Sequence, residues 1–232
     1  MIERYVDDDY VTQNPTWHVE DAAWKADQVF AMFERNGLWP DTVSEIGCGV
    51  GEMLRILAEK LPAARLTGYE IAPVAYERAK ARETDRLTFR PDPLPEGRSD
   101  VLLLIDVIEH VDDYIGLLRR VRGHAHWHML HVPLEMNIDR LLRRGFTEVR
   151  DRYGHLHYFT RETALATVRD AGYVVVDDFL THAVELEQPT SVRSWVGRLV
   201  RRGALRFNDD LAAKVFGGAQ LLILARPDSE AA

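Results

Sequence analysis

The sequence predicts an α/β protein whose core is a doubly wound sheet of seven strands with helices on both faces. Three observations predict this fold class. Short β-branched or apolar segments alternate with segments of helical periodicity along the 232 residues. Alternating glycines in residues 47–51 place a turn between the first such strand and the helix that follows it. A continuous apolar run in residues 100–111 is typical of a parallel strand buried on both faces.

The expected elements follow one another in a simple order, with turn residues between them. The predicted strands span residues 42–46, 65–70, 86–92, 100–106, 127–132, 173–180 and 220–225. The predicted helices span residues 17–36, 53–61, 112–122 and 161–172. We expect one domain over residues 1–232, with an N-terminal cap helix in segment 1–40 and two inserted lid segments at 134–158 and 183–218.

Composition excludes several classes of protein. A hydrophobic content of 46% is enough for a full core, and 37 acidic against 29 basic residues argue against a general nucleic-acid binder. The single cysteine, Cys48, lies in the glycine turn, so no intramolecular disulfide can form. The acidic N-terminus is not a signal peptide, and no apolar run is long enough to span a bilayer. We therefore expect a cytoplasmic protein.

The glycine turn and the acid before it indicate the charge of the ligand. Glu45 precedes Gly47, Gly49 and Gly51, and glycine allows both positive φ angles and a close approach of a ligand to the backbone. A dinucleotide-binding turn would need glycine at position 52, which is Glu. Because a carboxylate repels a pyrophosphate, Glu45 favours a ligand with an ammonium or sulfonium group.

Residues 45–51 resemble the first motif of the class I S-adenosyl-L-methionine (SAM)-dependent methyltransferases, small-molecule type. Residues 100–111 resemble the fourth motif of that family, and residues 154–160 resemble the His-x-x-x-Phe/Tyr-Thr run before its sixth helix. The resemblance implies a Rossmann-like, mostly parallel sheet with the last two strands antiparallel, and SAM as cofactor. It also implies methyl transfer to a small-molecule acceptor.

The cofactor-binding residues follow partly from chemistry and partly from the resemblance. Glu70 ends the second strand, where a carboxylate can accept hydrogen bonds from both ribose hydroxyls. By resemblance, Asp92 contacts the adenine amino group, and Asp106 and Val107 line the methionine side. The cap segment would close over the cofactor, although its tryptophans also suit ordinary packing. The expected cofactor-binding residues are Tyr10, Trp17, Glu45, Gly47, Gly49, Gly51, Glu70, Ile71, Asp92, Asp106 and Val107.

Methyl transfer to a hydroxyl requires removal of a proton, and histidine can accept one near neutral pH. We rank His155 first as the base, then His18 and His110, with His157 behind them. An amine acceptor would need only alignment, so a hydroxyl of a sugar or natural-product intermediate is favoured over an amine without excluding it. Arginines in segment 134–158 favour an anionic acceptor, or else form a solvated helix face.

Other functions remain open at this stage. A non-catalytic module that binds SAM or S-adenosylhomocysteine (SAH) would use the basic helix predicted in residues 191–207 to contact a partner. That helix suits packing or a homodimer contact better than a membrane surface. A nicotinamide-dependent dehydrogenase is disfavoured by Glu52. No metal site is predicted, because the histidines between 124 and 131 do not follow a zinc-binding pattern.

Overall fold

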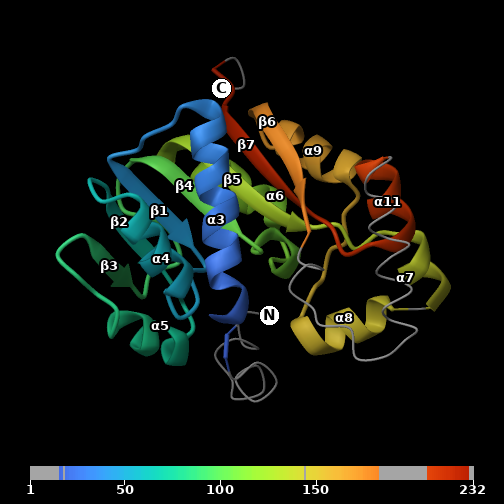
Figure 1. Ribbon diagram of the computed structural model, residues 1–232, viewed down its shortest axis with the longest axis horizontal. Coiled ribbons are helices and arrows are strands. Elements are labelled where there is room, and N and C mark those ends of the chain that lie inside the picture. Colours follow the sequence, from blue (N-terminus) through green and yellow to red (C-terminus); the bar gives the residue numbers. More distant parts are fainter. Residues whose placement is uncertain (1–15, 18, 144, 183–207, 230–232) are drawn as a thin grey trace.

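The computed structural model describes residues 16–17, 19–143, 145–182 and 208–229, and its centre is a seven-stranded sheet in the order β3-β2-β1-β4-β5-β7-β6 (Figure 1). Strands β1 to β5 pair in parallel, and β7 lies antiparallel between β5 and β6. The predicted mostly parallel sheet is therefore confirmed. The strands are β1 (Thr42–Ile46), β2 (Arg65–Tyr69), β3 (Leu87–Arg90), β4 (Ser99–Ile105), β5 (Ala125–Pro133), β6 (Tyr173–Thr181) and β7 (Gln220–Pro227).

Helices cover both faces of the sheet, which makes the fold doubly wound. Helices α3 (Val19–Asn36), α4 (Glu52–Lys60) and α5 (Pro73–Lys80) cover the front face in Figure 1. Helices α6 (Tyr114–Val121) and α9 (Arg161–Asp170) cover the other face. The remaining helices of the described chain are α7 (Ile138–Arg143), α8 (Phe146–Tyr153), α11 (Asp209–Phe216) and two short 3₁₀ turns, η1 (Ile108–His110) and η2 (Arg122–His124).

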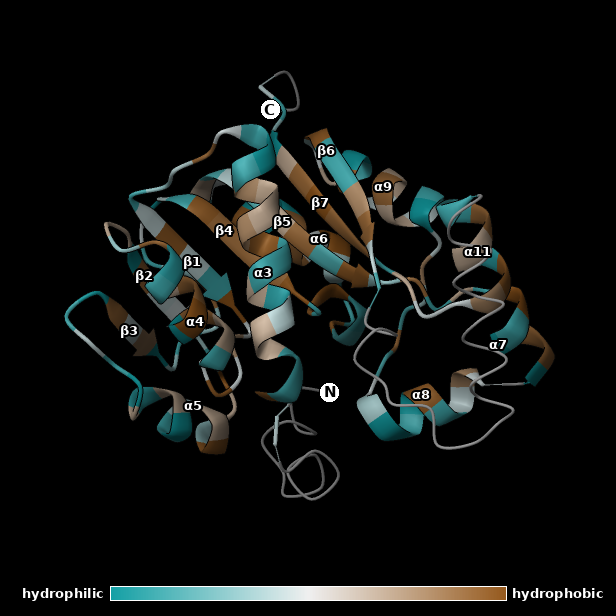
Figure 2. Ribbon diagram, viewed as in Figure 1, coloured by the Kyte–Doolittle hydropathy of each residue, from teal (hydrophilic) through white to brown (hydrophobic). Residues whose placement is uncertain are grey.

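Strand β4 shows why an uninterrupted apolar run forms the middle of the sheet. Val101, Leu103 and Ile105 belong to the core beneath α3 and α4, whereas Leu102 and Leu104 belong to the core beneath α6 and α9. Successive side chains of a strand point to opposite faces, so a strand covered on both sides must be apolar at every position. In Figure 2, β4 and β7 are largely brown, whereas the helices carry both teal and brown residues.

Two helix boundaries illustrate how local sequence sets the elements. The Thr160 hydroxyl accepts a hydrogen bond from the backbone N–H of Thr163, and the Thr163 side chain accepts one in return from the Thr160 N–H. This capping box starts α9 as predicted, with Thr in place of the more usual Glu. Gly154, at a φ of 81°, ends α8.

The structure describes nearly all of the first inserted segment but only the end of the second. Segment 134–158 was expected to leave the regular α/β alternation, and it contains the short helices α7 and α8 beside the sheet. Most of segment 183–218, including the predicted basic helix, lies outside the described residues, and α11 covers its end. Among the residues that the structure describes, no helix has the length and apolar character needed to cross a membrane.

Candidate active site

A cavity of about 830 Å³ opens at the carboxyl ends of β1, β2, β4 and β5, beneath the start of α3. Parallel α/β sheets bind ligands at this edge, next to the point where the strand order reverses between β1 and β4. The volume is within the range of pockets that hold a small-molecule ligand. The predicted cofactor-binding residues within the described part of the chain line this cavity, with the exception of Gly51.

The glycine turn after β1 forms one wall of the cavity, and two of its glycines have little room for a side chain. Gly47, Gly49 and Gly51 have φ angles of 70°, 55° and 76°. A Cβ atom on Gly51 would lie 2.4 Å from the ring of Phe89, and one on Gly47 would lie 3.1 Å from Val107. The turn is thus a cradle of bare backbone that a ligand can approach closely.

Glu45 lies under this turn as a buried and incompletely paired carboxylate. Its side chain is 3% exposed, and its Oε2 atom has no hydrogen-bond partner among the described residues. Burial raises the pKa of Glu45 to about 8, and the neighbouring Glu70 and Asp106 add to this while Lys25 opposes it. Such a group is stabilised by a cation entering the cavity, as expected from the sequence.

Glu70 links the end of β2 to the glycine turn. Its Oε2 accepts a hydrogen bond from the Gly49 N–H at 2.8 Å, and its Oε1 accepts one from the Ala72 N–H at 2.7 Å. Burial raises the pKa of Glu70, although these backbone hydrogen bonds act in the opposite direction. The residue predicted to hold the ribose therefore also fixes the turn that forms the cavity wall. Ile71 and Asp92 line the cavity nearby.

Asp106 follows β4 and is the centre of a charged cluster that the sequence analysis missed. One oxygen forms an ion pair with Lys25 of α3 at 2.8 Å, and the other lies 2.6 Å from Nδ1 of His131. His131 in turn contacts the Thr181 hydroxyl at 3.0 Å. Burial alone would raise the pKa of Asp106, but Lys25 and His131 outweigh it and hold the pKa well below its usual range.

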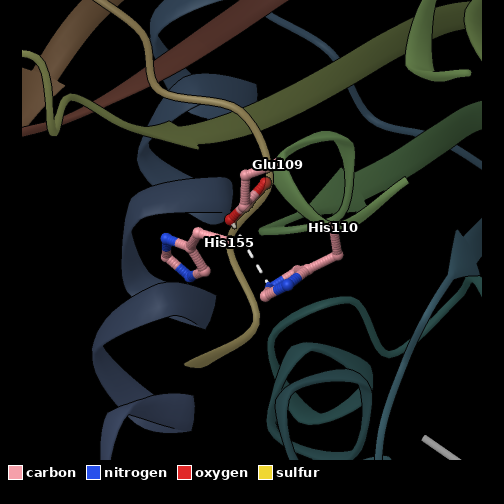
Figure 3. Close-up of side chains that lie close together, drawn as sticks. All are labelled: Glu109, His110 and His155. Carbon is pink, nitrogen blue, oxygen red and sulfur yellow. Dashed lines mark ion pairs between the residues drawn. The ribbon is translucent and has the colours of Figure 1, made fainter. Parts of the chain in front are cut away.

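Three ionisable residues that line the cavity lie close together: Glu109 and His110 from η1, and His155 from the loop after α8 (Figure 3). The rings of His110 and His155 are 4.7 Å apart and nearly perpendicular. The Nδ1 atom of His155 lies 2.8 Å from a carboxylate oxygen of Glu135, which follows β5. A carboxylate on Nδ1 orients the ring and leaves Nε2 facing away from Glu135.

Glu109 is a fully buried acidic residue. It is 0% exposed, and neither carboxylate oxygen has a hydrogen-bond partner within the described residues. Burial raises its pKa well above the usual range, and the negative charge of Asp106 adds to the effect. An acid in such surroundings is a candidate functional group, because its burial is costly unless a ligand compensates it.

The predicted catalytic histidines divide into two groups. His155 and His110 lie together and line the cavity, whereas His157 is absent from the lining and instead contacts the Val111 carbonyl at 3.0 Å. His18 and Tyr10 lie outside the described residues, while Trp17 lines the cavity. Of the histidines of β5, His128 serves the core. His128 is fully buried against Val121 and Tyr173, and burial lowers its pKa to about 4.

The sequence analysis did not name Lys25, Glu109 or Glu135 as site residues, although features of the sequence could have indicated each of them. Lys25 falls on the apolar face of the predicted helix, in phase with Ala22, Ala26 and Val29, which is unusual for a lysine that remains solvated. Glu109 directly precedes a ranked histidine, and Glu135 follows the predicted fifth strand at the edge where functional groups gather. His131 gave no such signal, because its role depends on contacts with β4 and β6.

Comparison with known proteins identifies the family. A model of the methyltransferase domain family matches residues 22–178. A malonyl-[acyl-carrier protein] O-methyltransferase from Anoxybacillus flavithermus is 32% identical over 89 residues, which are 37% of this chain and 34% of that protein. A trans-aconitate 2-methyltransferase from Streptomyces coelicolor is 42% identical over 41 residues, 18% of this chain and 14% of that protein. The matched stretches thus span about a third or less of these curated relatives.

A solved methyltransferase structure has a similar fold. The plantazolicin methyltransferase BpumL, solved in complex with a monoazolic desmethylPZN analogue and SAH, superposes with a TM-score of 0.55 at 18% identity. The superposition covers 98% of this chain and 90% of BpumL. The glycine cradle and the unpartnered oxygen of Glu45 fit the backbone approach and the positive charge of SAM. This chain belongs to the class I SAM-dependent methyltransferases, with SAM as its cofactor.

Proposed function

We propose that this protein methylates an oxygen atom of a small-molecule acceptor, which binds beside Glu109, His110 and His155. The observation that carries the proposal is the His155–Glu135 contact of 2.8 Å in the same cavity as the glycine turn. This contact supports a base role for His155, because an oriented imidazole would accept a proton from an acceptor bound in that cavity. A sugar or natural-product hydroxyl fits this arrangement, and an amine remains the less favoured acceptor.

Each end of the cavity has a separate task in this proposal. SAM, when bound, supplies an electrophilic methyl group. Glu45 would face its cationic methionine part, while Glu70 and Asp92 would hold the ribose and adenine. Glu135 keeps the proton of His155 on Nδ1, so Nε2 has the lone pair that accepts the proton of an acceptor hydroxyl. His110, 4.7 Å away, would position the acceptor.

The acceptor end of the cavity also supports an anionic acceptor. Of the arginines in segment 134–158, Arg140 lines the cavity, and its guanidinium lies 3.6 Å from Glu135. Arg143 is instead exposed and paired with Asp139, and Arg152 lies over the Tyr153 ring; neither lines the cavity. The names of both curated relatives refer to acidic compounds, a malonyl group and trans-aconitate. A carboxylate-bearing acceptor is therefore our preferred class.

Calorimetric titration with SAM, SAH and NAD is the first test. We expect SAM and SAH to bind and NAD not to bind, and we expect Glu70→Ala to abolish adenosyl binding through loss of its ribose and glycine-turn contacts. Methyl transfer from isotopically labelled SAM to a panel of small hydroxy acids then tests catalysis. Binding without turnover on any acceptor would favour the alternative function, a non-catalytic SAM or SAH binding module.

Arg140→Ala tests the nature of the acceptor. We expect the KM of an anionic acceptor to rise about tenfold, the loss of roughly 1.4 kcal/mol of binding, with SAM affinity unchanged. Arg143→Ala is the matched control, because Arg143 lies in the same helix but does not line the cavity. An equal KM in the wild type and both variants would rule out recognition of the anion by Arg140.

The proposal also includes the compartment of the protein and its assembly. We place the protein in the cytoplasm, where its single, buried Cys48 would stay reduced. A homodimer contact through residues 191–207 stays a prediction, since that segment lies outside the described residues.

A further inference from the structure

We propose that Glu109, His110 and His155 form a binding site for one divalent transition-metal ion, which binds the oxygen of the methyl acceptor. The inference deepens the proposed function and rests on it for the identity of the acceptor. The ion-binding part stands on the geometry of the three side chains alone.

The three residues are close enough to share an ion. Each offers one ligand atom, and these atoms all lie within 4.8 Å of one another (Figure 3). The Nε2 atom of His110 is 3.9 Å from Oε1 of Glu109. Two ligand atoms with bonds of about 2.0–2.2 Å to one tetrahedral ion are about 3.3–3.6 Å apart. The separations would therefore have to shorten by up to about 1.5 Å for all three atoms to reach coordination distance.

Glu109 is the strongest indication that a cation belongs here. It is fully buried, both carboxylate oxygens have no hydrogen-bond partner within the described residues, and it lines the cavity. Lys25, whose charge acts on Glu109, is already paired with Asp106 at 2.8 Å. A buried carboxylate without hydrogen bonds is costly to maintain, and an ion on its oxygens would remove that cost.

The surroundings of both histidines are those of metal ligands. Glu135 contacts Nδ1 of His155 at 2.8 Å, and the Gly154 carbonyl oxygen lies 3.4 Å from Nδ1 of His110. A carboxylate or carbonyl on one ring nitrogen orients the ring and increases the basicity of the other nitrogen, as is usual for metal-bound histidine. In His155, whose Nδ1 faces Glu135, Nε2 would bind the ion.

The donor set indicates which ions would bind. Two imidazoles and one carboxylate suit Zn²⁺, Co²⁺, Fe²⁺ or Mn²⁺ better than Mg²⁺ or Ca²⁺, which prefer oxygen ligands. Three protein ligands leave at least one coordination position open, as in catalytic metal sites. Because the three residues line the cavity, that position is accessible to an acceptor oxygen.

An ion at this site changes how the acceptor loses its proton. An ion held by these residues would lower the pKa of a bound acceptor hydroxyl, whose proton would then pass to water. The oxygen lone pair then forms the O–CH₃ bond as the S–CH₃ bond breaks, with its electron pair left on sulfur. His155 serves as ligand in this state, so it no longer acts as the free base.

The test measures ion binding directly on the full-length, tag-free protein after treatment with a chelator. Titration with Zn²⁺, and with Mn²⁺ monitored by electron paramagnetic resonance, should give one ion per chain. We expect Glu109→Gln and His155→Ala each to weaken binding at least tenfold. His126→Ala is the matched control, because His126 is exposed on β5 and should leave binding unchanged. Circular dichroism and SAM titration establish that each variant is folded.

The outcomes separate this inference from the proposed function. Sub-stoichiometric binding, or equal binding by the wild type and the Glu109→Gln and His155→Ala variants, overturns the metal site. Turnover that persists in excess chelator overturns the role of the ion, while methyl transfer itself still stands. Stoichiometric binding that requires Glu109, in a protein that transfers no methyl group, supports the site and contradicts the proposed function.

Discussion

Glu45 sets the electrostatic preference of the cofactor end of the cavity. Burial raises its pKa to about 8, so the free protein holds a proton on this carboxyl at neutral pH. A cationic ligand favours the ionised carboxylate and therefore lowers that pKa. Because the raised pKa exceeds the ordinary value, Glu45 contributes to folding stability below about pH 4.5, and this contribution is lost as pH rises through about 8.

We therefore predict that SAM binding releases a proton near pH 7 and strengthens as pH rises, by up to about tenfold per pH unit until about pH 8. Calorimetry in two buffers with different ionisation enthalpies measures the proton release. The Glu45→Gln variant should bind SAM weakly, release no proton, and unfold at a higher temperature than the wild type at pH 9. Proton uptake by the wild type on binding would contradict this account of Glu45.

The cap helix α3 is attached to the sheet by two kinds of contact. Its apolar face packs on α4 and the core, with Met32 and Phe33 fully buried. Lys25 adds an ion pair of 2.8 Å to Asp106, with side chains only 15% and 22% exposed. Asp106 has a φ of 54°, an unusual conformation for a residue other than glycine. The pair therefore fixes both the helix and the turn after β4.

Lys25→Met should destabilise the protein by about 2–4 kcal/mol, because it removes the cation paired with the largely buried carboxylate of Asp106. Lys60→Met is the matched control. Lys60 links α4 to Asp27 of α3 through a more exposed pair of 2.6 Å, which should contribute about 0–1 kcal/mol. Urea denaturation of both variants measures the difference. Equal effects would mean that the Lys25 pair adds no more than a surface pair.

At the scale of the whole molecule, the site exists only where separate layers meet. The front-face core beneath α3 and α4 and the rear core beneath α6 and α9 together place the ends of β1, β2, β4 and β5 at one edge. The cavity walls come from the turns after these strands, from the start of α3, and from the segment between β5 and α9.

Hydrogen exchange with and without SAH tests this arrangement as a unit. We predict the largest gain in amide protection in residues 45–51, 69–72 and 105–111, which line the cavity after three separate strands. A smaller, uniform gain elsewhere follows from ligand binding to the folded state alone. A gain concentrated instead in β6 and α11 would contradict the location of the cofactor.

Local sequence was sufficient to predict the elements and the cofactor turn, while the acceptor end required the structure. Hydrophobic period, glycine positions and capping residues act over a few neighbouring residues, so the seven strands, the start of α9 and residues 45–51 were predictable. The short helices α7 and α8 were not expected, because six and eight residues give little periodic signal. The pairing of Lys25 with Asp106, and the convergence of Glu109, His110 and His155, join residues distant in the chain. Such contacts depend on how complete layers pack, which no local pattern encodes.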